Sequence, residues 1–142
     1  MQKIEEVILF QIEQTSKLSK QYSQREFDEK KLGITVDQWV IMKIVQESTD
    51  LTQRELAKKS RRDPASITRT IDLLEKKNLL TRVDVPDSRR TYHIELTQTG
   101  QDFIAKHLPM VKAQRKNSVK GLSKEELEMM SKMLAKMREN MS

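Results

Sequence analysis

The stretch RRDPASITRTIDLLEKKNLL, residues 61–80, combines basic and short polar side chains in a pattern that suits contact with nucleic acid. On a helical wheel one stripe is apolar, and the opposite face carries arginine, lysine and small residues. Arginine can pair with guanine through two hydrogen bonds, serine and threonine can serve either kind of base edge, and alanine can meet a thymine methyl group. The candidates for base contact are Ala65, Ser66, Thr68 and Arg69.

Other basic side chains nearby suit phosphate contacts, which give affinity without sequence information. Between Thr52 and Tyr92 there are eleven lysines and arginines against six acids, so this segment holds nearly all of the net charge of +6. The candidates for phosphate contact are Arg54, Lys58, Lys59, Arg61, Arg62 and Lys76. A solvated surface helix would show a similar charge, so the neighbouring elements have to distinguish the two interpretations.

The apolar spacing predicts the helices that position these side chains. A long helix is expected from the N-terminus to about Lys31, and Gly33 can end it in the left-handed conformation. Capping patterns predict three further helix starts, at Thr35, Thr52 and Asp63. The last two helices are short and adjacent and form a helix-turn-helix pair, in which the first residues of the second helix reach base edges in the major groove.

After Asn78 the apolar period changes from 3.6 to 2, which indicates strands. In LLTRVDV one face is formed by Leu79, Thr81, Val83 and Val85, and TYHIEL alternates in the same way. The turn-rich and charged sequence PDSRR lies between the two strands. These features predict a two-stranded hairpin with a basic tip.

Two helices are expected to complete the chain, the first capped by Thr97 and the second by Ser123. The last helix carries an apolar seam with heptad spacing, formed by Leu127, Met130, Leu134 and Met137. Such a seam packs against a partner helix. Together with the apolar stripe of the N-terminal helix it predicts a homodimer, and a helix that lies on its own domain is the alternative.

The order of these elements, with the sequence LEKKNLLTRVDVPDSRRTYHIELTQTG, resembles the MarR (multiple antibiotic resistance regulator) family of winged-helix transcription factors. LTQRELAKKS resembles the first helix of the family's helix-turn-helix pair, and SITRTIDLLEKKNLL its recognition helix. The resemblance covers nearly the whole chain. It implies a mainly α (α+β) single domain over residues 1–142, with dimerisation helices at 1–33 and 98–142 and a winged helix-turn-helix lobe at 35–97.

The family's wing motif is Asp-x-Arg, three residues, an aliphatic residue, a spacer, Leu-Thr and a glycine three residues later. The residues that fit this frame are Arg90, Ile94, Leu96, Thr97 and Gly100. The aspartate expected two residues before Arg90 is Ser88, whereas Asp87 lies one place earlier and is the candidate support for the wing. Arg90 is the first candidate for insertion into the minor groove, whose negative potential attracts arginine, and Arg89 is the second.

The resemblance also implies partners. It predicts a repressor that binds a pseudo-palindromic operator in double-stranded DNA as a homodimer. Members of the family are often released from DNA by a small phenolic or anionic effector that binds between the dimer helices and the DNA-binding part. The residues that suit such a site, and equally suit a plain core, are Tyr22, Trp39, Met42, Phe103 and His107.

Other classes find less support in the sequence. The chain has no cysteine, no apolar run near 18 residues and no secretory signal pattern, which predicts a cytoplasmic protein without a membrane span. His93 and His107 fall on separate elements and no nucleophile or phosphate-loop motif is present, so no enzyme, metal or cofactor is predicted. The alternatives are a helical interaction module and a nonspecific DNA-binding architectural protein. A single-strand binder is disfavoured because Tyr92 is the lone aromatic of the basic stretch.

Overall fold

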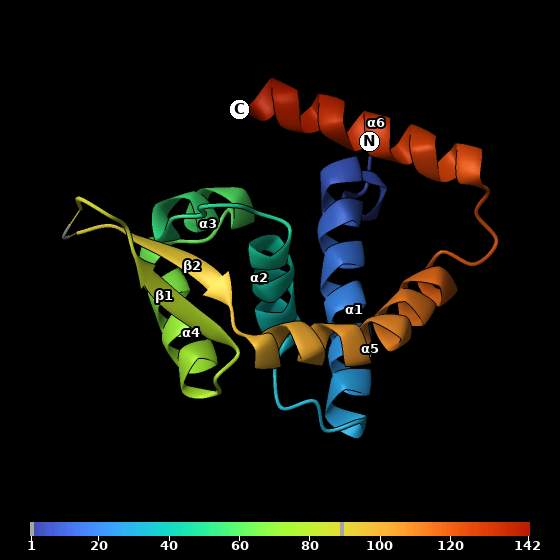
Figure 1. Ribbon diagram of the computed structural model, residues 1–142. Coiled ribbons are helices and arrows are strands. Elements are labelled where there is room, and N and C mark those ends of the chain that lie inside the picture. The colour runs from blue at the N-terminus through green and yellow to red at the C-terminus, as the bar shows by residue number, and fades with distance from the viewer. Residues whose placement is uncertain (1, 89) are drawn as a thin grey trace. The chain divides into compact units, whose positions relative to one another are not determined.

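The computed structural model describes residues 2–88 and 90–142. Over these residues the chain forms one short 3-10 helix, six α-helices and a two-stranded antiparallel sheet (Figure 1). The elements are η1 (Ile4–Glu6), α1 (Ile8–Glu29), α2 (Val36–Gln46), α3 (Gln53–Ser60), α4 (Pro64–Lys76), β1 (Leu80–Asp84), β2 (Tyr92–Leu96), α5 (Gln98–Ser118) and α6 (Lys124–Met141). The chain divides into two compact units, Met1–Pro109 and Met110–Ser142, which are described separately below.

The predicted capping residues open the helices. Thr35 Oγ1 accepts the Gln38 N–H at 3.1 Å, and Gln38 Oε1 accepts the Thr35 N–H at 3.0 Å, so the predicted capping box is confirmed. The side chains of Thr52 and Asp63 each accept a backbone N–H at the start of α3 and α4. A cap of this kind contributes about 1 kcal/mol, because it satisfies a donor that has no partner within the helix.

Three helices of the first unit end at residues other than glycine. Lys31, Arg61 and Asn78 follow α1, α3 and α4 with φ of 52°, 54° and 59°. After each of them, the next N–H donates to the carbonyl five positions earlier at 2.9–3.1 Å, which is the Schellman arrangement. The prediction that Gly33 ends α1 is therefore wrong. Lys31 ends the helix, and Gly33 lies in the loop beyond it with φ 79°.

The hairpin pairs Leu80 with Leu96 and Arg82 with Ile94. Residues that are directly opposite in an antiparallel ladder share a face, so Leu80, Arg82 and Ile94 lie on one side of the sheet. Leu80 and Ile94 are buried there, whereas Val83 on the other side is 37% exposed. The buried face of β1 is therefore the one that begins at Leu80.

Two residues of the Leu-Thr-x-x-Gly segment join α5 to the end of α4. The Thr97 hydroxyl donates to the Asn78 carbonyl at 2.6 Å and accepts the Gly100 N–H at 2.9 Å, which confirms Thr97 as the cap of α5. A Cβ on Gly100 would lie 2.1 Å from the Leu79 carbonyl oxygen, so no other residue fits at this position. The close approach explains why the sequence has glycine here.

The apolar face of α4 is fixed against the core of the first unit. Ile67, Ile71 and Leu74 are fully buried, as are Leu56 of α3 and Leu80 of β1. Each such side chain contributes roughly 1.5–3 kcal/mol by leaving water. The packing therefore determines which face of α4 is presented to solvent.

Candidate nucleic-acid interface

The solvent face of α4 carries the residues predicted to contact bases. Ala65, Thr68 and Arg69 are exposed and Ser66 is half-buried. No hydrogen bond or ion pair within the described chain engages the guanidinium of Arg69. This side chain is therefore available to an external acceptor.

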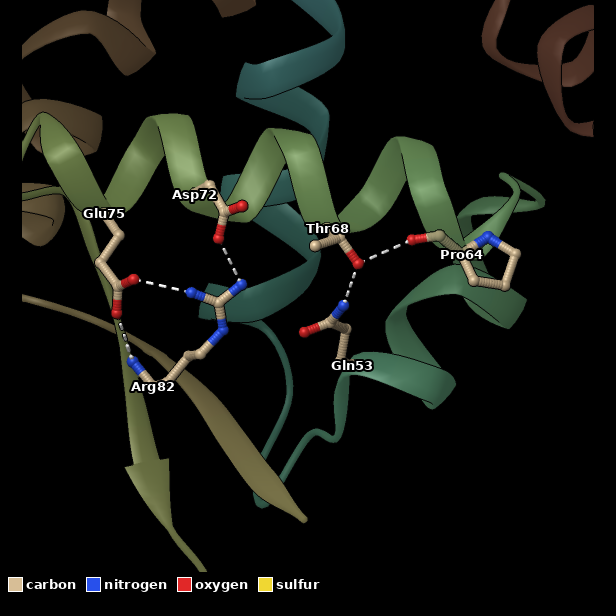
Figure 2. Close-up of polar contacts among 6 residues, drawn as sticks. All are labelled: Gln53, Pro64, Thr68, Asp72, Glu75 and Arg82. Carbon is tan, nitrogen blue, oxygen red and sulfur yellow. Dashed lines mark hydrogen bonds and ion pairs between the residues drawn. The ribbon is translucent and has the colours of Figure 1, made fainter. Parts of the chain in front are cut away.

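A stripe along one side of α4 is joined to neighbouring elements by polar contacts (Figure 2). Near the start of the helix, Gln53 Nε2 of α3 donates to Thr68 Oγ1 at 2.6 Å. Near its end, Arg82 of β1 forms ion pairs with Asp72 and Glu75, both at 2.7 Å. The Arg82 N–H also donates to the Glu75 carboxylate at 3.3 Å.

Sequence reasoning did not identify Gln53 or Arg82. Both contacts join two separate elements, which the periodicity within one element does not record, and neither residue breaks an apolar period. The available signal was that Asp72 and Glu75, spaced three apart, place two carboxylates along one side of a basic helix. A nearby arginine was needed to offset them.

A groove of about 1040 Å³ lies beside the start of α4. Its walls come from α3, the connection to α4, the first residue of α4 and the tip end of the hairpin at residues 90–92. The basic side chains that line it are Arg54, Lys58, Arg61, Arg62 and Arg90. None of its described lining residues is acidic. The groove is therefore a concave surface that attracts a polyanion.

Five of the six predicted phosphate-contact residues are exposed, and the sixth, Arg62, is half-buried. Arg54, Lys58, Arg61 and Lys76 are exposed, with no ion pair or hydrogen bond of their side chains within the described residues. Lys59 is also exposed, and its Nζ donates to Ser48 Oγ at 3.3 Å.

Arg62 has a structural partner. Its Nη2 lies 2.6 Å from Asp37 Oδ1, and Lys20 Nζ lies 2.5 Å from the other oxygen of the same carboxylate. The hydrogen bond from Arg62 lowers the pKa of Asp37, with a further contribution from Lys20. The ion pair ties the loop before α4 to α2 and α1, so Arg62 is less available to DNA than the sequence indicates.

The hairpin tip brings Arg90 to the groove. The Ser88 N–H donates to the Val85 carbonyl at 3.1 Å, and Asp87 has the left-handed φ of 67°. Arg90 is exposed and lines the groove. Within the described residues Asp87 forms no ion pair with Arg90, and Arg89 lies outside the described residues.

Three of the five predicted effector-site residues form a chain of rings. Trp39 and Phe103 have centroids 6.5 Å apart, and Phe103 and His107 have centroids 4.5 Å apart. Trp39 and Met42 are fully buried, whereas Tyr22 is half-buried. The Trp39 Nε1–H is buried without a hydrogen-bond partner in the described structure. Burial lowers the pKa of His107, and the charge of Lys106 lowers it further.

Within the second unit, α6 keeps its apolar seam accessible. Leu127, Leu134 and Met137 are half-buried and Met130 is 43% exposed. A groove of about 870 Å³ lies between the end of α5 and the start of α6, where Leu122 and Leu127 provide apolar walls. No residue of α6 is fully buried, and the role of these four residues as a dimer seam stays a prediction.

Two kinds of site are missing from the described residues. No described helix combines the length and apolar character that a membrane crossing requires. No group of three or more histidine, aspartate or glutamate side chains in the described chain is arranged to hold a metal ion.

Comparisons with known proteins give one match to a protein-family model and several solved structures with a similar fold. Residues 34–92 match the model of the MarR family. The chain is similar to a MarR/EmrR family transcriptional regulator from Acinetobacter sp. ADP1, with a TM-score of 0.89 and 21% identity over 99% of this chain and 98% of the other. It is also similar to MepR of S. aureus, solved in complex with DNA, with a TM-score of 0.83 and 24% identity over 94% and 98% of the two chains.

A third similar structure is BpsR of Bordetella bronchiseptica, whose DNA binding is regulated by 6-hydroxynicotinic acid. Its TM-score is 0.81, with 19% identity over 92% of this chain and 98% of the other. The three likenesses confirm the predicted fold, which is mainly helical with a small antiparallel sheet and a winged helix-turn-helix.

Proposed function

We propose that this chain, a MarR-family protein by the match over residues 34–92, represses transcription by binding an operator in double-stranded DNA as a homodimer. The observation that carries the proposal is the groove beside α4, which gathers five basic side chains and has no acid among its described lining residues. A basic concave surface next to an exposed helix face is the electrostatic footprint of a nucleic-acid binder.

The exposed face of α4 and the groove have different tasks in this proposal. Ala65, Ser66 and Arg69 contact base edges in the major groove, with Arg69 as the guanine-pairing residue. Arg54, Lys58 and Arg61 contact phosphates, which sets the position of α4 without specifying sequence. Arg90 enters the adjacent minor groove from the hairpin tip.

The homodimer follows from the seam of α6 and from the geometry of an operator. One copy of α4 contacts one half-site, and two copies must lie about one helical turn apart, roughly 34 Å. The exposed Met130 and the half-buried Leu127, Leu134 and Met137 offer the apolar surface that a second copy can cover. MepR, which shares the fold, was solved in complex with DNA.

We also propose that a small aromatic acid releases the protein from DNA. The buried Trp39 Nε1–H without a partner supports this, because an unpaired buried donor costs about 1–3 kcal/mol and is satisfied by a ligand oxygen. Phe103 and His107 continue the ring cluster from Trp39 and offer a stacking surface. The regulation of BpsR by 6-hydroxynicotinic acid is in line with such a ligand.

The two alternatives make different predictions about DNA. A helical interaction module would not bind the region upstream of its own gene. A nonspecific architectural protein would bind that region and a scrambled duplex equally, with the same dependence on salt.

The test is an electrophoretic mobility shift against the upstream region and a scrambled duplex of equal length. The affinities are measured from 50 to 200 mM salt, because binding that depends on phosphate contacts weakens steeply over this range. The salt dependence separates the phosphate contribution to affinity from the sequence-specific contribution. We expect the upstream region to bind at least about a thousandfold more tightly than the scrambled duplex, which is the low end for specific regulators. Equal affinity for both duplexes would refute specific regulation, and no binding would refute the DNA-binding role.

A further inference from the structure

The hydroxyl of Thr68 is already occupied in the structure. Its proton is donated to the Pro64 carbonyl at 3.0 Å, and its oxygen accepts the Gln53 Nε2–H at 2.6 Å. A threonine hydroxyl has one proton to donate. While the bond to Pro64 holds, Thr68 therefore has no hydrogen to offer a base.

The methyl group is the apolar part of the exposed Thr68 side chain, and the hydroxyl, with its proton donated to Pro64, can act toward an external group as an acceptor only. Figure 2 shows the methyl carbon pointing away from the Pro64 carbonyl, and the residue as a whole is exposed. We infer that Thr68 meets DNA with its methyl group and packs it against the 5-methyl group of a thymine, and that Gln53 is the positioning residue that holds it so. The inference rests on the proposed DNA-binding function.

Gln53 is placed to act through Thr68. It is the first residue of α3 and half-buried, and it lines the basic groove beside α4. Its amide donates to Thr68 across the helix-turn-helix, so the side chain of Thr68 is fixed from α3 as well as from its own helix. A threonine whose hydroxyl is held by two hydrogen bonds has its χ1 angle fixed, so its methyl group takes one orientation, and this orientation makes contact with a thymine methyl group selective.

Replacement of single thymines by uracil tests the inference, because uracil lacks the methyl group and keeps the same hydrogen-bonding edge. We expect at least one operator thymine whose replacement lowers affinity about fourfold, as for the loss of one buried methyl group. Thr68→Val puts a second methyl group in place of the hydroxyl and, in the rotamer that valine prefers in a helix, keeps the first methyl group in place. This variant should therefore still bind the uracil operator less tightly than the thymine operator. Thr68→Ser removes the methyl group, and should bind the thymine and uracil operators equally.

A second pair of variants tests the role of Gln53. Gln53→Met keeps the length of the side chain and removes the hydrogen-bond donor. It should reduce the ratio of the affinities for the thymine and uracil operators toward one, without changing the melting temperature. Adding Thr68→Val should restore the ratio, because valine needs no hydrogen bond to hold its methyl group. Lys58→Ala is the matched control from the same groove, and should weaken both operators equally.

Three results would overturn the inference. Loss of the discrimination in Thr68→Val would show that the hydroxyl makes the contact, and its retention in Thr68→Ser would assign it to another residue. An unchanged ratio in Gln53→Met would refute the positioning role. Failure of the wild-type protein to bind the operator is a separate outcome, which would overturn the proposed function itself and be seen before any variant is made.

Discussion

Arg61 and Arg62 are adjacent in the sequence but have different surroundings in the structure. Arg61 is exposed in the left-handed conformation after α3 and lines the groove. Arg62 is half-buried and paired with Asp37. Removing either side chain deletes one positive charge, so a comparison of the two separates DNA contact from fold stability.

We expect Arg61→Ala to weaken binding to all duplexes alike and to reduce the slope of log K against log salt by about one. Arg62→Ala should instead lower the free energy of unfolding by about 1–2 kcal/mol, since it removes a charged hydrogen bond that is only partly shielded from water. Urea unfolding and salt-dependent binding, measured on both variants, provide the check. A stable Arg62→Ala protein with a reduced salt slope would show that Arg62 contacts phosphate.

The Asp37–Arg62 pair also predicts a pH dependence. The hydrogen bond from Arg62 holds the pKa of Asp37 below its ordinary value near 3.8, so the carboxylate binds a proton less readily in the folded state. Its stabilising contribution is fully present above that ordinary value and is lost as the pH falls through the lowered pKa. The stability difference between wild type and Arg62→Ala should therefore be constant from pH 5 to 7, a range well above that pKa, and shrink at lower pH. A difference that grows on acidification would contradict the assignment.

Arg69 is the residue whose loss should change sequence preference. Arg69→Ala should cost about 1–3 kcal/mol on the preferred operator and relax the choice at particular base pairs, because a paired contact with guanine is removed. Affinities for a set of single-base operator variants give the measurement, with Lys58→Ala as the control that keeps the ranking. An unchanged ranking in Arg69→Ala would mean that another face of α4 meets the bases.

At the scale of elements, α4 has three longitudinal stripes with separate tasks. Ile67, Ile71 and Leu74 face the core, and Ala65 and Arg69 face solvent. The stripe between them is held by α3 at one end and by β1 at the other (Figure 2). The two polar contacts fix the rotation of α4 about its axis, which apolar packing alone leaves less strictly determined.

The Arg82 contact also offsets two carboxylates on a helix that we propose to lie against DNA. We expect Arg82→Gln to lower operator affinity about three- to tenfold, the equivalent of roughly 1 kcal/mol, while the cost in stability stays small because Asp72 and Glu75 are partly exposed. The triple variant that adds Asp72→Asn and Glu75→Gln should recover the affinity. Binding and melting measurements on both variants test this, and no recovery would show that Arg82 acts through the fold of the hairpin.

The elements followed from the sequence more completely than the contacts between them. Helix starts depend on a side chain and the N–H three residues later, so Thr35, Thr52 and Asp63 were predictable from local spacing. The end of α1 was not, because Lys31 adopts a conformation in which glycine is the usual residue. The bonds of Gln53 to Thr68 and of Arg82 to Asp72 join separate elements, and no periodicity records such pairings.

At the scale of the whole molecule, the surface that we propose for DNA and the surface that we propose for a partner belong to different segments of the chain. The groove and the exposed face of α4 lie within residues 52–92, whereas the apolar seam lies on α6. Variants of α6 should therefore leave the chemistry of each half-site intact. They should instead decide whether the protein is a dimer that binds two half-sites at once or a monomer that binds one.

Met130 and Met129 form a matched pair for this test, since both are exposed methionines of α6 and Met130 alone lies on the seam. Met130→Lys places a charge where a second copy would pack, and an unpaired charge at a desolvated interface is costly. We expect it to give a monomer at micromolar concentration and to lose most of the affinity for a two-half-site operator, because each half-site alone binds weakly. Met129→Lys should remain a dimer with wild-type affinity. Sedimentation velocity and binding to full and half operators measure both effects, and a dimeric Met130→Lys protein would show that copies associate through another surface.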